Sequence, residues 1–156
     1  MIADLAIEIV DPGHPDALKL IGELDAYQNS IYPEESNHLD SIEELRADHV
    51  RFMGAFHDLD MVACGAIKLF ADYAEVKRIY VPPPLRGRVI GRAMIRALEA
   101  QAMKHGRHTA RIETGVYQPE ALALYQIMGY QKCEAFGDYP NDPMSVFMQK
   151  ALVPPI

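Results

Sequence analysis

The chain has 156 residues, of which 49% are hydrophobic and 24% are charged. This length and composition predict a single globular domain over residues 1–156, which buries roughly 70% of the surface of the unfolded chain. The net charge of −7 argues against a nucleic acid or an anionic membrane surface as the main partner, because binding to a phosphate backbone needs a basic stripe.

Cysteine usage and the N-terminal sequence bear on the compartment. Cys64 and Cys133 are the only cysteines, so neither a disulfide framework nor a cysteine metal site is expected. The N-terminal residues lack a basic region followed by an apolar run, and no stretch approaches the roughly 20 apolar residues of a membrane span. We therefore expect a soluble cytoplasmic protein.

Hydrophobic periodicity and turn residues predict alternating strands and helices. Strands are expected at residues 6–10, 50–57, 61–70, 74–81, 109–114, 130–136 and 144–150, and helices at residues 17–30, 41–44, 89–105 and 119–128. Ser41 and Glu44 have the spacing of a capping box, and Pro119 suits the first turn of its helix. This order predicts an α/β fold with a mixed sheet and helices on both of its faces.

The segment 75–92 is the most informative part of the chain. An alternating strand stops at three prolines, and a turn rich in Arg and Gly then opens an amphipathic helix. Unpaired N–H groups at a helix start, together with the positive end of the helix dipole, hold a phosphate or pyrophosphate, which predicts a nucleotide-like cofactor. The alternative is that Arg86, Arg88, Arg92 and Arg96 form a solvated basic face.

The three prolines also affect the sheet. None of Pro82, Pro83 and Pro84 can donate to a sheet ladder, so the strand must stop pairing there. We therefore expect the sheet to splay, leaving backbone groups near residues 79–81 free to pair with an extended ligand.

Two motifs indicate a family. Arg86-Gly-Arg-Val-Ile-Gly91 follows the fourth strand, and Gln118-Pro-Glu-Ala-Leu-Ala-Leu-Tyr-Gln-Ile-Met-Gly-Tyr130 follows the fifth. In this order and at this separation they resemble the GCN5-related N-acetyltransferases (GNAT) over nearly the whole chain, and residues 113–120 and 136–146 resemble a small bacterial subgroup that acts on small molecules. The resemblance implies a mostly antiparallel sheet of six or seven strands, splayed between the fourth and fifth.

The resemblance also implies direct acetyl transfer from acetyl-coenzyme A, a co-substrate, to the amine of a small molecule or amino-acid-like acceptor, without a metal. The implied cofactor-binding positions are Ile79, Tyr80, Val81, Arg86, Gly87, Arg88, Val89, Ile90, Gly91, Arg92, Gln118 and Tyr125. Two of them depart from the family pattern. Val89 replaces a glycine, and its branched side chain obstructs the pyrophosphate unless Cβ points away. Gln118 replaces an asparagine and keeps the amide.

Tyr125 stands where the family commonly has the phenol that protonates the departing thiolate, although its helical spacing also suits a core aromatic. Glu75 stands where some members have a general base, and Glu113 ends the next strand near the same crevice. A solvated carboxylate is the alternative for both, and ordered water can deprotonate the amine instead.

The acceptor site is expected beneath the loop that contains Tyr32, Glu35 and His38, together with Arg78 and Glu113. We expect Lys77, Arg78 and Tyr80 to lie on alternating sides of their strand. Those that face the crevice would bind a carboxylate of the acceptor, whereas an acidic loop would suit a cationic amine, and the sequence does not decide between the two.

The main rival to an enzyme is a non-catalytic module that binds or senses coenzyme A on the same fold, which the departure at Val89 favours. His105 and His108 do not predict a metal pair, because Gly106 breaks the helix that would align them. The sequence leaves open whether the protein forms a homodimer.

Overall fold

A computed structural model describes residues 5–37, 39–87 and 89–153. Its strands form one sheet in the order β1-β2-β3-β4-β5-β7-β6. Only β4 and β5 pair in parallel; the other neighbours are antiparallel. The mixed, mostly antiparallel sheet predicted from the sequence is confirmed. The strands are β1 (Leu5–Ile9), β2 (Val50–His57), β3 (Asp60–Leu69), β4 (Ala74–Tyr80), β5 (Thr109–Gly115), β6 (Gln131–Cys133) and β7 (Ser145–Ala151).

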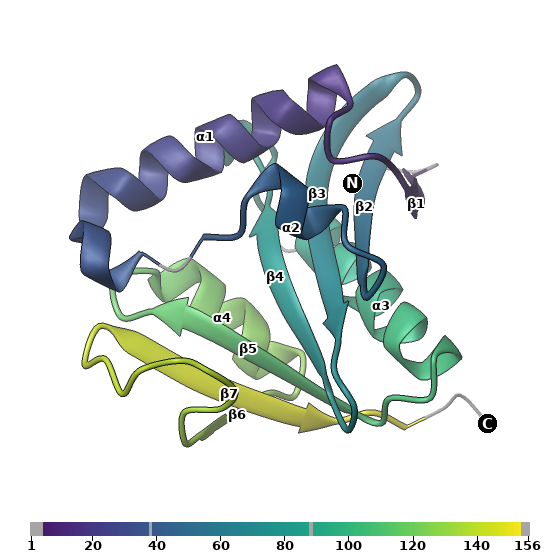
Figure 1. The fold of residues 1–156 in the computed structure, drawn as a ribbon. Coiled ribbons are helices and arrows are strands. Elements are labelled where there is room, and N and C mark those ends of the chain that lie inside the picture. The colour runs from purple at the N-terminus through teal and green to yellow at the C-terminus, as the bar shows by residue number, and fades with distance from the viewer. Residues whose placement is uncertain (1–4, 38, 88, 154–156) are drawn as a thin grey trace.

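Helices cover both faces of the sheet, as predicted (Figure 1). The helices α1 (Pro15–Ile31) and α2 (Ile42–Leu45) lie on one face, and α3 (Val89–Lys104) and α4 (Pro119–Ile127) lie on the other. Two short 3-10 turns, η1 (Glu34–Ser36) and η2 (Pro83–Leu85), lie in the connections. None of the helices in the described part of the chain is long and apolar enough to cross a membrane.

Capping residues that are recognisable in the sequence mark the ends of several helices. Ser41 and Glu44 form the predicted capping box at the start of α2, because each side chain accepts a hydrogen bond from the other residue's backbone N–H. Gly106 has a φ of 78° directly after the last turn of α3, and Gly129 has a φ of 96° after α4.

The sheet separates two hydrophobic cores. Behind the sheet, α3 and α4 bury residues such as Met94, Leu98 and Tyr125 against β3, β4 and β5. In front, α1 buries Leu20 and Leu24 against the opposite face of the sheet. The two helix layers therefore hold the central strands firmly, and the region where β4 and β5 diverge lies between them.

The predicted splay between β4 and β5 is present, but it begins earlier than the prolines. The two strands pair only from Ala74 to Val76. The register between β3 and β4 shifts here, because Lys77 lies opposite Ala66 whereas Tyr80 lies opposite Cys64. Arg78 has a φ of 58°, and the extra residue makes this a β-bulge. A bulge within β4, rather than Pro82, therefore coincides with the end of pairing.

The bulge corrects the expected alternation of side chains along β4. Lys77, Arg78 and Tyr80 do not lie on alternating sides; their side chains all reach residues of α1 or of the loop that follows it. The inserted residue causes this, since two successive side chains at a bulge point to the same side of the sheet.

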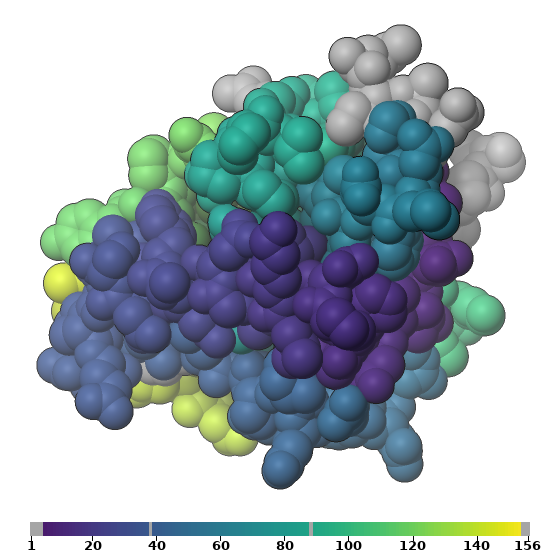
Figure 2. Space-filling model, turned by 90° about the horizontal axis from the view of Figure 1, so that it is seen from above, coloured from purple at the N-terminus to yellow at the C-terminus, as the bar shows by residue number. Residues whose placement is uncertain are grey.

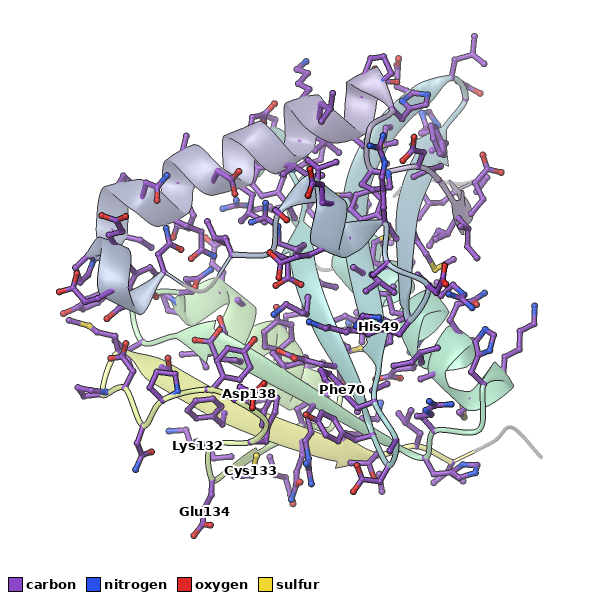
Figure 3. The ribbon with its side chains drawn as sticks, viewed as in Figure 1. His49, Phe70, Lys132, Cys133, Glu134 and Asp138 are labelled. Carbon is purple, nitrogen blue, oxygen red and sulfur yellow. The ribbon has the colours of Figure 1, made fainter. Side chains whose placement is uncertain are left out.

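The strand β6 is shorter than the expected residues 130–136. After Cys133 the chain leaves the sheet, and Phe136 packs into an aromatic cluster with its ring 5.5 Å from that of Phe147 and 5.5 Å from that of Tyr139. Asp138 marks the loop that follows, which crosses in front of the sheet (Figure 3). The loop brings Tyr139 to the site described below.

Candidate active site

A groove of about 460 Å³ runs between the start of α3, the N-terminal half of α4 and the middle of α1. Figure 2 shows the surface where α1, the segment after β4 and the start of α4 lie side by side. Eight of the predicted cofactor-binding residues line the groove: Ile79, Tyr80, Val81, Arg86, Gly87, Gly91, Gln118 and Tyr125. Sequence reasoning missed the remainder of the lining, which comprises Leu24, Tyr27, Leu85, Pro119, Glu120, Ala121 and Leu124.

Arg86 is held across the mouth of the groove. Its Nε donates a hydrogen bond to the Val81 carbonyl at 2.8 Å, and its Nη1 lies 3.5 Å from Glu120 Oε2. A side chain at Gly87 would meet no atom within 4 Å, so the backbone there is open to a ligand. At Gly91, by contrast, a Cβ would come within 2.8 Å of Leu124 Cδ2, so this glycine allows α3 and α4 to approach each other.

The other predicted cofactor residues lie elsewhere. Ile90 is buried in the core behind the sheet, and neither Val89 nor Arg92 is among the described residues that line the groove. Val89, the first residue of α3, is 51% exposed. Arg88 lies outside the described residues.

A second, smaller cavity of about 70 Å³ lies between β4, β5 and the end of α1. It brings together Tyr32, Arg78 and Glu113, three of the predicted acceptor-site residues, with Glu75. Glu35 is exposed on η1 and is not among the described residues that line this cavity; Ser36 and Leu39 line it instead. His38 lies outside the described residues.

The groove and the small cavity meet. Leu24, Ile79, Gln118 and Tyr125 line both of them. The splay between β4 and β5 opens this passage, because two fully paired strands would close it. A ligand in the groove and a second ligand in the small cavity would therefore approach each other beside Tyr125 and the backbone of Ile79.

Tyr125 is buried where the two cavities meet, with 7% of its surface exposed. Burial raises the pKa of its phenol, and the negative charge of Glu113 raises it further. The phenol is therefore protonated at neutral pH and can donate a proton to an anion formed beside it. Tyr125 also packs with the core behind the sheet, as its helical spacing suggested. A tyrosine can belong to the core and still present its hydroxyl to a ligand.

Two carboxylates face the small cavity in different surroundings. Burial raises the pKa of Glu113 to about 7, although Ser145 Oγ donates a hydrogen bond to its Oε2 at 2.7 Å and opposes the rise. Burial also raises the pKa of Glu75. Glu75 accepts a hydrogen bond from the Tyr139 hydroxyl at 2.5 Å and lies 3.5 Å from Lys77 Nζ. Glu75 is therefore the more firmly held of the two.

Gln118 joins the loop after β5 to α1. Its Oε1 accepts hydrogen bonds from the Tyr32 hydroxyl at 3.3 Å and from the Gly115 N–H at 3.2 Å. The Tyr32 hydroxyl in turn accepts a hydrogen bond from the Tyr117 N–H at 3.0 Å. The amide at this position thus fixes the wall shared by the two cavities.

Sequence reasoning missed several partners of the predicted residues. Asp40 pairs with Lys77 at 3.1 Å, and Asp25 pairs with Arg78 at 2.7 Å. The Tyr139 hydroxyl accepts a hydrogen bond from Lys77 Nζ at 2.7 Å. Asp25 is signalled weakly, by an acidic residue that falls in line with Leu18, Ile21 and Leu24 on the predicted helix. Asp40 and Tyr139 lie in loops, whose course no periodicity predicts.

Comparisons with known proteins agree with this geometry. The model of the acetyltransferase (GNAT) family matches residues 19–130. An IAA acetyltransferase of Azospirillum brasilense is 42% identical over 137 residues, which cover 86% of this chain and 90% of that protein. A crystal structure from Klebsiella pneumoniae, described as an acyl-CoA N-acyltransferase, has a TM-score of 0.82 at 36% identity and covers 96% of this chain and 99% of that one.

A further solved structure bears on the fold alone. The PaiA N-acetyltransferase of Thermoplasma acidophilum, in complex with coenzyme A, is 20% identical to this chain and has a TM-score of 0.76. The match covers 96% of this chain and 99% of that one.

Proposed function

The chain belongs to the acetyltransferase (GNAT) family, and we propose that it transfers the acetyl group of acetyl-coenzyme A directly to the amine of a small-molecule acceptor. One observation carries the proposal: the long groove and the small polar cavity meet beside Tyr125, as a two-substrate transfer requires. The name of the Azospirillum brasilense relative supports a small-molecule acceptor.

The groove fits an extended cofactor. Beyond Val76, β4 has no pairing with β5, which leaves the edge at Ile79 and Val81 beside the groove. Gly87 leaves open space at the far end, where the backbone before α3 would hold the pyrophosphate with Arg86 beside it. When bound, acetyl-coenzyme A supplies the activated acetyl group as a thioester.

We assign the acid and the base from their surroundings. Tyr125 is the general acid, because its protonated phenol lies where the two cavities meet and a thiolate would form. Glu113 is the general base, because a pKa of about 7 lets it accept a proton near neutral pH. Glu75, the base expected from the sequence, is the second candidate, since Tyr139 and Lys77 already engage its carboxylate.

The protons balance with these roles. Glu113 takes one proton from the acceptor's ammonium group and later releases it to solvent. The neutral nitrogen then bonds to the acetyl carbon, the carbon–sulfur bond breaks, and Tyr125 protonates the departing sulfur. The nitrogen loses its second proton as the amide forms, and that proton returns to Tyr125.

The test is the variant Tyr125→Phe, with Tyr73→Phe as the matched control, because Tyr73 is a buried tyrosine among the described residues outside both cavities. Release of the coenzyme A thiol is followed with a panel of small amines, and acetyl-coenzyme A affinity is measured by calorimetry. Tyr125→Phe should lower kcat about 100-fold, the usual contribution of a general acid, with affinity kept.

The same experiment separates the enzyme from the rival binding module. A module that only binds coenzyme A would show affinity without turnover in the wild type. Wild-type turnover in Tyr125→Phe would show that this phenol is not the acid.

A further inference from the structure

Arg78 has a guanidinium group that the protein only partly engages. Its side chain is 3% exposed and lines the small cavity. Its Nη2 lies 2.7 Å from Asp25 Oδ1, but its Nε and Nη1 are buried without a hydrogen-bond partner among the described residues. Buried charged donors without partners are costly. The bulge in β4 places the side chain here, since Arg78 occupies the inserted position.

The other cation of the small cavity has no such unused donors to offer. Lys77 Nζ lies 3.1 Å from Asp40 Oδ1 and 3.5 Å from Glu75 Oε2, and it donates a hydrogen bond to Tyr139. Lys77 is therefore satisfied by the protein, and among the described lining residues Arg78 is the cation able to bind an anionic group.

Asp25 engages only part of the Arg78 guanidinium group. The ion pair joins one nitrogen of Arg78 to one oxygen of Asp25, whose side chain is 40% exposed at the surface of α1. Nε and Nη1 lie on different edges of the guanidinium, and each shares its edge with Nη2. Because Nη2 carries two N–H groups and only one nitrogen–oxygen contact joins it to Asp25, one of these edges can bind a second carboxylate through two parallel hydrogen bonds.

We propose that the acceptor is an amino acid or a related amino-carboxylate, whose carboxylate binds Arg78 while its amine faces Glu113 in the same cavity. The proposal rests on the proposed function and narrows its substrate class. The charges of the cavity match such a molecule at both ends: Arg78 faces the anion, and Glu75 and Glu113 face the ammonium group. An acceptor with an amine alone would leave the guanidinium unsatisfied.

The test compares acceptors that differ only in the carboxylate. A series of α-, β- and γ-amino acids is assayed beside the primary amide of each, with thiol release from acetyl-coenzyme A as the signal. We expect at least one amino acid to be acetylated with a kcat/KM about 100-fold above that of its amide, in line with the loss when one partner of a buried charge pair is removed.

Two variants attribute the preference to Arg78. Arg78→Met should lower kcat/KM for the amino acid about 100-fold and leave that for the amide nearly unchanged. Asp25→Asn removes the protein's own partner and leaves the guanidinium, so it should keep or increase the preference for the acid. A merely structural ion pair predicts instead that both variants lose activity on acid and amide alike.

Equal use of acids and amides, or acetylation of amides alone, would overturn the proposal. If nothing in the series is acetylated, calorimetry measures binding of the same acids to the wild-type protein with coenzyme A present. Binding that Arg78→Met abolishes supports the proposal, and no binding overturns it. The proposed function fails separately, if the protein neither binds acetyl-coenzyme A nor acetylates any amine.

Discussion

Glu113→Gln should make the protein's stability less dependent on pH. In the folded chain burial raises the pKa of Glu113 from 4.5 to about 7, so between these values the folded state binds a proton that the unfolded chain has lost. The neutral carboxyl's contribution to stability is therefore fully present below pH 4.5 and is lost as the pH rises through about 7. At 1.36 kcal/mol per pH unit, the whole loss is about 3 kcal/mol.

Between pH 5.5 and 8.5 the loss from Glu113 alone is about 2 kcal/mol, with pKa values of 4.5 unfolded and about 7 folded. Gln has nearly the same shape as protonated Glu but does not titrate. Between pH 5.5 and 8.5 the free energy of unfolding of the wild type should therefore fall by about 2 kcal/mol relative to that of Glu113→Gln. Urea unfolding at both pH values measures the difference. Glu134→Gln, which changes the charge of an exposed carboxylate, is the control. Parallel pH profiles for wild type and Glu113→Gln would refute the reasoning.

Three further predictions concern activity and packing. If Glu113 is the general base, kcat/KM of the wild type should rise as the pH passes through about 7, and this rise should be missing from the pH profile of Glu113→Gln. A rise that persists in Glu113→Gln but is lost in Glu75→Gln would make Glu75 the base. Tyr130→Phe removes a hydroxyl that donates to buried Glu99 at 2.8 Å, so it should lower the free energy of unfolding by about 1–3 kcal/mol, and an unchanged urea midpoint would contradict this. Gly115→Ala places a methyl group onto the Tyr32 hydroxyl and should cost about 1–3 kcal/mol with loss of turnover, while Gly22→Ala, at a position of α1 outside both cavities where a Cβ meets no atom within 4 Å, should keep turnover.

The elements with clear periodicity were predictable within a residue or two. Residues 50–57 form an apolar run rich in strand-forming residues, and β2 spans those residues. Residues 130–136 look equally strand-like, but β6 ends at Cys133 because burying Phe136 among aromatic rings competes with continued pairing.

The shape of the site was less predictable, because it depends on backbone irregularity and loop course. No glycine marks the bulge in β4; Arg78 itself adopts the positive φ, and this decides which side chains share the small cavity. Tyr139 reaches Glu75 across 64 positions of sequence, and such pairings follow only from the folded chain. By contrast, the groove proposed for the cofactor lies beside a local motif, and eight of its fifteen described lining residues were predicted.

The most direct test of the account is calorimetric titration with acetyl-coenzyme A of the wild type and of Ala121→Trp, which fills the groove from α4. Ala100→Trp, at an exposed position of α3, is the matched control. The wild type and the control should bind acetyl-coenzyme A with micromolar affinity, on the order of −8 kcal/mol, and Ala121→Trp should not bind it. Binding of equal strength to all three would place the cofactor elsewhere, and no binding to the wild type would contradict the proposed function.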